Sequence, residues 1–397
     1  MTTEMTKVQS GDVIKVQSGD LGLGRPLPFS VYDQNGVLLL KAGIVINLPR
    51  QMERLLEGGV FYSQTEALAL RRAASPHPAS ATLPEAEVTN AFEMLESVKA
   101  RLYRVFINFS NPNYHKEVLA SVEDVALTVQ EACQYDTDSA LASLHLDYDS
   151  SYSVVHHLQA GLLCELVGKR LGIKEEARLT LIKAAITHDI GLHDIQDTLD
   201  RQVAPLSEAQ KARIQSHPSD SARILGELGV TDRVWLDAVQ NHHERIDGSG
   251  YPSHCSGDVI TPPARILAVA DIYSAMVRDR PYRKAMVSKE AMRQLLIDQG
   301  KTTDARVTQI MIKEVGIFPP GTIVKLANGE VAVVKERSDN ATAPVVYAFM
   351  RPDDMPRLSP ARRETALAEY AIEGMMPFSR YKGSMAIIRG LWGTGKQ

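Results

Sequence analysis

Histidine and aspartate residues gather in the middle of this 397-residue chain. Ten of its eleven histidines lie between His115 and His254, and several stand in segments that are otherwise apolar. A buried polar or charged side chain is costly unless it is paired or bound to a cation. Because imidazole and carboxylate groups are common ligands of divalent metals, we expect this part of the chain to hold metal ions.

Two predicted buried helices give the clearest indication of a metal site. The segment 179–191 is apolar over most of its surface, yet it ends in the adjacent pair His188-Asp189. The segment 264–276 has the pattern of a core helix, with the carboxylate of Asp271 in its middle. An isolated charge in either helix would be strongly destabilising, so both positions require a cation nearby.

Four more histidines stand at the ends of predicted helices. His156 opens a leucine-rich helix, and His217 precedes Pro218 at an expected helix junction. His242 and His243 end a helix whose inner face is apolar. A lone histidine of this kind is more often a hydrogen-bonded core residue than a ligand, but five histidines and two aspartates on separate helices favour a metal centre.

Seven donors are too many for one ion. A carboxylate such as Asp189 can bridge two metals, and ions about 3.5 to 4 Å apart polarise a bridging water into hydroxide while clamping a phosphoryl group. The three cysteines contain no CxxC pair, so nitrogen and oxygen ligands are expected. This donor set suits iron or manganese, with zinc and nickel as alternatives.

The elements that position these residues predict a mainly α fold with small β-rich parts at both ends. Residues 26–46 have the pattern of a hairpin around Asn35-Gly36, and a short helix is expected at 49–57. Residues 72–86 contain three prolines and many small side chains, which is typical of a linker. Helical periodicity dominates from Glu85 to Lys313.

A second predicted hairpin turns at Asn328-Gly329, and residues 345–349 would add a third strand. We therefore expect five parts. They are a small N-terminal β-rich domain at 1–70, a linker at 71–87, the helical domain at 88–316, a small β-hairpin module at 317–360 and a tail at 361–397.

The composition excludes some classes of protein. The formal net charge of -4 argues against bulk nucleic-acid binding. The sequence has no run of 18 apolar residues and no apolar N-terminal leader, so membrane insertion is not expected. Together with the odd cysteine count, this predicts a cytoplasmic protein.

The order and spacing of the histidines resemble those of the HD-GYP family. The resemblance rests on His156, His188-Asp189, His217-Pro218, the string HHERIDGSGYP at 242–252, and Asp271, and it covers about Tyr152 to Val315. It implies an all-helical HD-type hydrolase, a phosphodiesterase that cleaves the bacterial second messenger cyclic di-GMP to pGpG or GMP. His188 and Asp189 would form its catalytic pair.

The resemblance also implies a ligand for each metal position. One metal would bind His156, His188, Asp189 and Asp271, and the other Asp189, His217, His242 and His243. Gly250 and Tyr251 would edge the substrate site, while Arg280 and Arg283 would lie near phosphate.

The chain departs from the family pattern at two positions. Leu192 stands where members carry the lysine of HDxGK, which would contact the scissile phosphate, and His193 or an arginine is a candidate replacement. Some members bind a third metal through a glutamate four residues before the first histidine. This chain has Tyr152 there, so we expect two metals.

Two other functions remain open from the sequence. The first is a catalytically impaired receptor or scaffold for cyclic di-GMP, which Leu192 favours; the second is an HD hydrolase of another nucleotide. Signalling partners would bind through the GYP loop or the flanking β modules. The amphipathic stripe between Glu85 and Asn108 offers a surface for a homodimer, although such stripes more often face the chain's own core.

Overall fold

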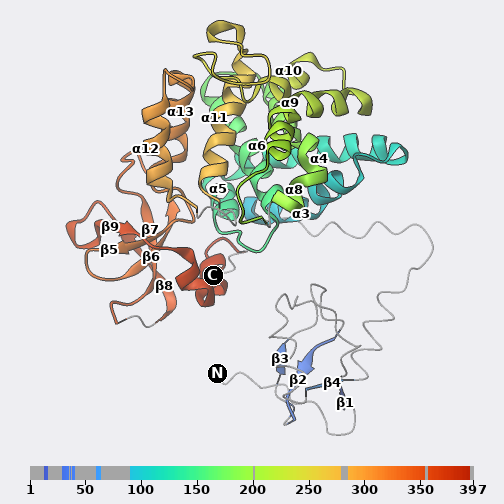
Figure 1. Cartoon of the computed structure of the whole chain (residues 1–397). Coiled ribbons are helices and arrows are strands. Elements are labelled where there is room, and N and C mark those ends of the chain that lie inside the picture. The colour runs from blue at the N-terminus through green and yellow to red at the C-terminus, as the bar shows by residue number, and fades with distance from the viewer. Residues whose placement is uncertain are drawn as a thin grey trace. The chain divides into compact units, whose positions relative to one another are not determined.

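The computed structural model describes residues 13–16, 29–34, 36, 38–40, 60–63, 90–199, 202–278, 285–353 and 356–393 (Figure 1). The chain divides into two compact units, Met1–Glu85 and Ala86–Gln397. The predicted helix at 49–57 and the predicted linker at 72–86 lie outside the described residues. No helix within the described ranges is long and apolar enough to cross a membrane.

The first unit contains an antiparallel sheet with the strand order β1-β4-β2-β3. Its strands are β1 Val13–Lys15, β2 Val31–Tyr32, β3 Leu38–Leu40 and β4 Phe61–Ser63. Strands β2 and β3 pair as the predicted hairpin, and Gly36 takes a φ of 74° in its turn, where glycine avoids a steric clash. The Phe29 ring stacks on Tyr62 with centroids 3.9 Å apart.

The second unit is mainly helical, as predicted. Its α-helices are α3 Ala91–Asn108, α4 His115–Tyr135, α5 Thr137–His145, α6 Tyr152–Arg170, α7 Glu175–Thr187, α8 His193–Leu199, α9 Glu208–Leu228, α10 Arg233–Asn241, α11 Pro262–Met276, α12 Ser288–Asp298, α13 Ala305–Val315 and α14 Met385–Arg389. Short 3₁₀ turns are η1 Pro112–Tyr114, η2 Ile190–Leu192, η3 Gly257–Val259, η4 Ala368–Tyr370 and η5 Phe378–Ser384.

Helix α6 lies at the centre of the helical core. Its residues between Val154 and Gly168 are buried, and it packs against α7. It also packs against α11 (Figure 1). The predicted apolar stripe of α3 is confirmed as core, because Leu95, Val98 and Leu102 are all buried. The core therefore fixes the relative positions of α6, α7 and α11, which carry part of the histidine and aspartate set.

The expected helix junction at Pro218 was wrong, because α9 continues through this residue. The helix begins with a capping box formed by Ser207 and Gln210 and ends at Gly229, whose φ is 101°. A proline inside a helix cannot donate a hydrogen bond to the carbonyl four residues earlier, here that of Ile214. His217 Nδ1 donates to that carbonyl instead, at 2.5 Å, so the group stays satisfied.

A five-stranded antiparallel sheet follows the helices, with the order β8-β7-β6-β5-β9. Its strands are β5 Ile323–Leu326, β6 Val331–Glu336, β7 Val345–Met350, β8 Pro356–Glu364 and β9 Ile372–Met375. The predicted hairpin at Asn328-Gly329 and the third strand are confirmed. The predicted module limit at residue 360 falls inside β8, and β9 lies within the predicted tail.

Candidate metal centre

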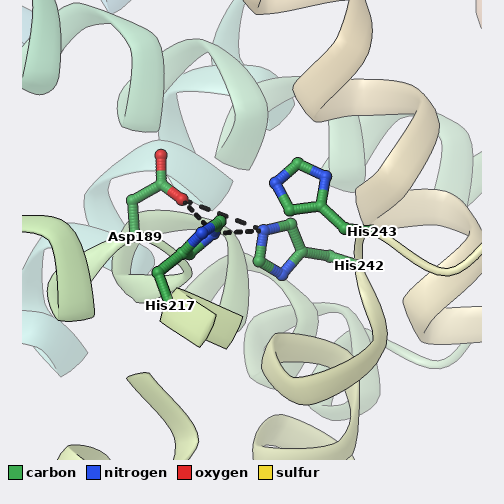
Figure 2. A group of neighbouring side chains, drawn as sticks. All are labelled: Asp189, His217, His242 and His243. Carbon is green, nitrogen blue, oxygen red and sulfur yellow. Dashed lines mark hydrogen bonds and ion pairs between the residues drawn. The ribbon is translucent and has the colours of Figure 1, made fainter. Parts of the chain in front are cut away.

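The seven predicted ligands lie together, although they come from five helical regions. His188 directly follows α7, His242 directly follows α10, and Asp271 lies in α11, while His156 belongs to α6 and His217 to α9. The side chains form two groups. Within each group, the donor atoms all lie within 4.8 Å of one another. The first group is Asp189, His217, His242 and His243 (Figure 2), and the second is His156, His188 and Asp271.

In the first group, the Nε2 atoms of His217 and His242 are 3.2 Å apart and face Asp189 (Figure 2). His217 Nδ1 contacts the Ile214 carbonyl at 2.5 Å, and His242 Nδ1 contacts the Val239 carbonyl at 2.7 Å. A carbonyl only accepts, so each Nδ1 carries the hydrogen and each Nε2 carries a lone pair. Two facing lone pairs repel each other, and a cation between them would remove that repulsion.

Local helix geometry supplies these carbonyl acceptors. Val239 lies in the last turn of α10, where carbonyls have no partner within the helix. The Ile214 carbonyl is available because Pro218 has no N–H to donate to it. Each histidine is thus held in the tautomer that suits a metal ligand.

In the second group, His156 and His188 direct Nε2 toward Asp271 Oδ1, at 3.2 and 3.6 Å. His188 Nδ1 donates to the Ala185 carbonyl at 2.7 Å. Ser274 Oγ donates its one hydrogen to the Asp271 carbonyl at 3.0 Å, so it accepts from His156 Nδ1 at 3.1 Å. Both Nε2 atoms are buried without a hydrogen-bond partner, and a metal ion would satisfy them.

The two carboxylates extend across both groups. Asp189 Oδ1 is 2.9 Å from His217 Nε2, while its Oδ2 is 3.5 Å from His188 Nε2. Asp271 Oδ1 faces His188, while its Oδ2 is 3.8 Å from His243 Nδ1. Each carboxylate therefore offers one oxygen to each group, which supports the predicted bridging role of Asp189.

The charges of the group fit a cation. Burial alone would raise the pKa values of Asp189 and Asp271, but the neighbouring imidazoles outweigh it and hold both well below the usual range. Burial alone would lower the pKa of His188, yet the two carboxylates raise it to about 9. Burial lowers the pKa of His243 to about 4. With its raised pKa, His188 is protonated at pH 7 beside the two carboxylates, and a divalent metal would replace its proton and leave two ionised carboxylates and neutral imidazoles as donors.

A cavity of about 470 Å³ is lined by the four residues of the first group and by Asp271 of the second. Tyr251 lines it, with its ring centroid 4.7 Å from that of His243. Gly250 packs so closely beneath that a Cβ atom would lie 2.5 Å from Glu244 Cα and 2.5 Å from the His243 carbonyl oxygen. The buried Glu244 carboxylate accepts two backbone N–H groups of the following loop, at 2.6 and 3.0 Å. Of the two predicted substrate-site residues, Tyr251 thus lines the cavity, whereas Gly250 packs against the Glu244 backbone and is not part of the lining.

The predicted phosphate contacts Arg280 and Arg283 lie outside the described residues. Leu192 is in η2 and lines the cavity. His193 packs edge-on against Phe109, with centroids 5.2 Å apart, and is not part of the lining. Among the described lining residues, Arg245 is the one lysine or arginine, a position that the sequence reasoning did not select.

His157 is a second residue that the sequence reasoning missed. It is buried, its Nδ1 donates to the Ser153 carbonyl at 2.6 Å, and its Nε2 has no hydrogen-bond partner. Burial lowers its pKa to about 3. Its donor atom forms a further close group with those of His188 and Asp189. The adjacent histidines at 156–157 were the available signal, but their apolar surroundings favoured an ordinary core residue.

The chain is similar in sequence to known phosphodiesterases. The family model described as HD domain matches residues 139–307. The cyclic di-GMP phosphodiesterase PA4108 of Pseudomonas aeruginosa is 28% identical over 275 residues, which cover 69% of this chain and 66% of that protein. The 3'3'-cGAMP-specific phosphodiesterase 1 of Vibrio cholerae is 30% identical over 204 residues, which cover 50% of this chain and 47% of that protein.

A solved structure gives a similar match. Bd1817, an HDG"Y"P protein from Bdellovibrio bacteriovorus, is 17% identical with a TM-score of 0.48, covering 76% of this chain and 99% of that chain. The chain spans less than two thirds of the length of the curated relatives given above.

Proposed function

We propose that this chain, whose residues 139–307 match the HD domain model, is an HD-GYP protein and a metal-dependent phosphodiesterase that hydrolyses cyclic di-GMP to pGpG or GMP. The observation that carries this proposal is the pair of histidine groups joined by Asp189, whose side chain lines the cavity. Cyclic di-GMP is preferred as substrate because the Pseudomonas aeruginosa relative, which matches 69% of this chain, is named for it.

The protein's own contribution is to hold donors in place. Carbonyl groups fix the Nδ1 atoms of His188, His217 and His242, and Ser274 fixes that of His156, so their Nε2 atoms remain free as ligands. When bound, two divalent ions would polarise the scissile phosphate and lower the pKa of a water molecule between them. The donor set of five imidazoles and two carboxylates favours iron or manganese.

The cavity would receive the cyclic dinucleotide. Its volume of about 470 Å³ lies within the range of small-molecule sites, roughly 300 to 1,000 Å³. Tyr251 offers a ring face beside the metal groups, and Arg245 offers a guanidinium suited to phosphate. Arg280 and Arg283 remain proposed phosphate contacts.

The remaining features are part of the same proposal. The domain at 1–70 would receive a signal or a partner, and the GYP loop or the sheet β5–β9 would offer a second surface. The apolar stripe of α3 is buried in the chain's own core, so a homodimer would need another surface. Three free cysteines fit a cytoplasmic protein.

The test is turnover by the purified full chain loaded anaerobically with Fe²⁺ or Mn²⁺. Cyclic di-GMP and 3'3'-cGAMP are supplied separately, and the products are followed by chromatography. We expect pGpG or GMP from the parent and from the control His115→Ala, which lies outside both groups, but none from His188→Ala.

Two outcomes would contradict the proposal. Tight binding of cyclic di-GMP without product would indicate the receptor or scaffold, for which Leu192 is the favouring feature. Turnover of 3'3'-cGAMP alone, or of neither compound, would indicate a hydrolase of another nucleotide.

A further inference from the structure

His157 lies beside the second histidine group with a donor atom that no protein group satisfies. Its side chain is buried, and its Nδ1 hydrogen is used by the Ser153 carbonyl. The Nε2 lone pair therefore has no hydrogen-bond partner. The donor atoms of His157, His188 and Asp189 all lie within 4.8 Å of one another.

This close group cannot hold an ion of its own. His188 Nδ1 is bonded to the Ala185 carbonyl, so Nε2 is its one available donor, and the His156 group uses the same atom. An ion on His188 Nε2 is therefore within reach of both groups. Two ligand atoms on opposite sides of an ion, each with a bond of about 2.1 Å, lie about 4.2 Å apart. A small movement of the side chains would therefore bring all the donor atoms to bonding distance of one ion.

We propose that His157 is a further ligand of the ion held by His188. This ion would then have five protein donors, from His156, His157, His188, Asp189 and Asp271. Five donors exceed the four of a tetrahedral zinc site and favour an ion of higher coordination number, such as Fe²⁺ or Mn²⁺. The inference rests on the metal centre of the proposed function but not on its substrate.

Packing alone gives a different expectation. The His157 ring lies 4.9 Å from that of Phe106 and 4.7 Å from that of His188, so an aromatic side chain fits the space. If His157 only filled this space, phenylalanine would replace it without effect on metal binding, because it removes an unsatisfied nitrogen and keeps the shape.

The experiment compares the parent with His157→Phe and His157→Gln, and uses His193→Ala as a matched control. His193 also packs near Phe106 but belongs to neither metal group. Metal content after dialysis, Mn²⁺ affinity by chelator competition, the Co²⁺ absorption spectrum and metal-free unfolding in urea are measured for each protein.

We expect the parent and His193→Ala to bind two ions. His157→Phe should bind one of them about 10- to 100-fold more weakly and show a Co²⁺ spectrum of lower coordination number, while its metal-free stability is kept or increased. His157→Gln, which offers an oxygen donor, should recover part of the affinity. Equal Mn²⁺ affinity and equal Co²⁺ spectra in the parent and His157→Phe would overturn the inference alone, whereas a parent that binds no ion would overturn the metal centre as well.

Discussion

Backbone carbonyls determine the chemical state of individual histidines in this protein. His188, His217 and His242 each donate Nδ1–H to the carbonyl of the residue three positions earlier. The acceptor is free at a helix end for His188 and His242, and beside a proline for His217. All three ligands are therefore oriented in the same way. Each depends on a helix carbonyl that has no backbone N–H partner.

Pro218→Ala tests this dependence. Alanine restores an N–H that competes with His217 for the Ile214 carbonyl, so the tautomer of His217 becomes less fixed. We expect the free energy of unfolding to rise by about 1 to 3 kcal/mol, because proline inside a helix is destabilising. Metal affinity should fall about tenfold. Urea unfolding and chelator competition measure the two effects, and a variant that gains stability and keeps full affinity would show that the proline is not needed for ligation.

Leu192→Lys tests whether turnover is limited by the absence of the lysine that the HDxGK pattern carries at this position. Leu192 lines the cavity on the turn that directly follows Asp189, so a lysine there would extend toward bound phosphate. We expect turnover of cyclic di-GMP to rise about tenfold, which corresponds to about 1.4 kcal/mol of transition-state stabilisation. Leu192→Met is the control for shape without charge. The idea fails if both variants change the rate equally.

At the scale of single residues, most of the site could be predicted and its hydrogen bonding could not. Asp271 and His188 were visible because a charge or an imidazole in an apolar helix needs a reason. His157 has the same surroundings, but its one signal, the adjacent His156, did not distinguish a ligand from a core residue. Tautomers depend on carbonyls that only the folded helices bring near.

At the scale of elements, the C-terminal sheet shows that a local sequence pattern predicts a hairpin but not the pairing of strands that are far apart in the chain. The hairpin at Asn328-Gly329 follows from its turn residues, but β9 pairs with β5 from a segment about fifty residues later. This pairing depends on packing, because Tyr381, Ile388 and Trp392 beyond β9 join one apolar cluster with Val333 and Phe349. A short strand with glycine, such as Ile372–Met375, carries too little pattern to be found alone.

A buried ion-pair cluster ties two parts of this sheet together and gives it a pH dependence. Glu330, directly before β6, accepts hydrogen bonds from Arg363 of β8 at 2.7 and 3.0 Å and from Arg357. Burial alone would raise the pKa of Glu330, but the hydrogen bonds from Arg363, Asn328 and Arg357 lower it to about 2. Because the folded pKa lies below the ordinary value of 4.5, the stabilisation is fully present above pH 4.5 and is lost as the pH falls toward 2.

Glu330→Gln should remove this contribution. We expect the variant to be less stable than the parent at pH 7 by up to about 3 kcal/mol, with the difference shrinking as the pH falls from 4.5 toward 2. Urea unfolding of both proteins at several pH values measures the difference. A gap that stays constant over this range would mean that the charge of Glu330 does not stabilise the fold.

At the scale of the whole molecule, the metal ligands join parts of the chain that are far apart in sequence. They span residues 156 to 271 and come from α6, α9 and α11 and from the residues that follow α7 and α10. The unfolded chain cannot hold them in one place, so bound ions should stabilise the folded helical unit by mass action. At a free ion concentration 100 times the Kd, one site contributes about 2.7 kcal/mol.

Metal removal should therefore lower the melting temperature. We expect chelation to reduce the Tm of the parent by roughly 5 to 10 °C, since about 1 kcal/mol corresponds to roughly 2 to 4 °C in a domain of this size. His188→Ala lacks the Nε2 donor shared by two close groups but keeps all four donors of the first group, so chelation should lower its melting temperature by less than that of the parent. Calorimetry on both proteins measures the shifts. An equal shift in parent and variant would show that an ion held through His188 does not stabilise the fold, because only the parent keeps that donor.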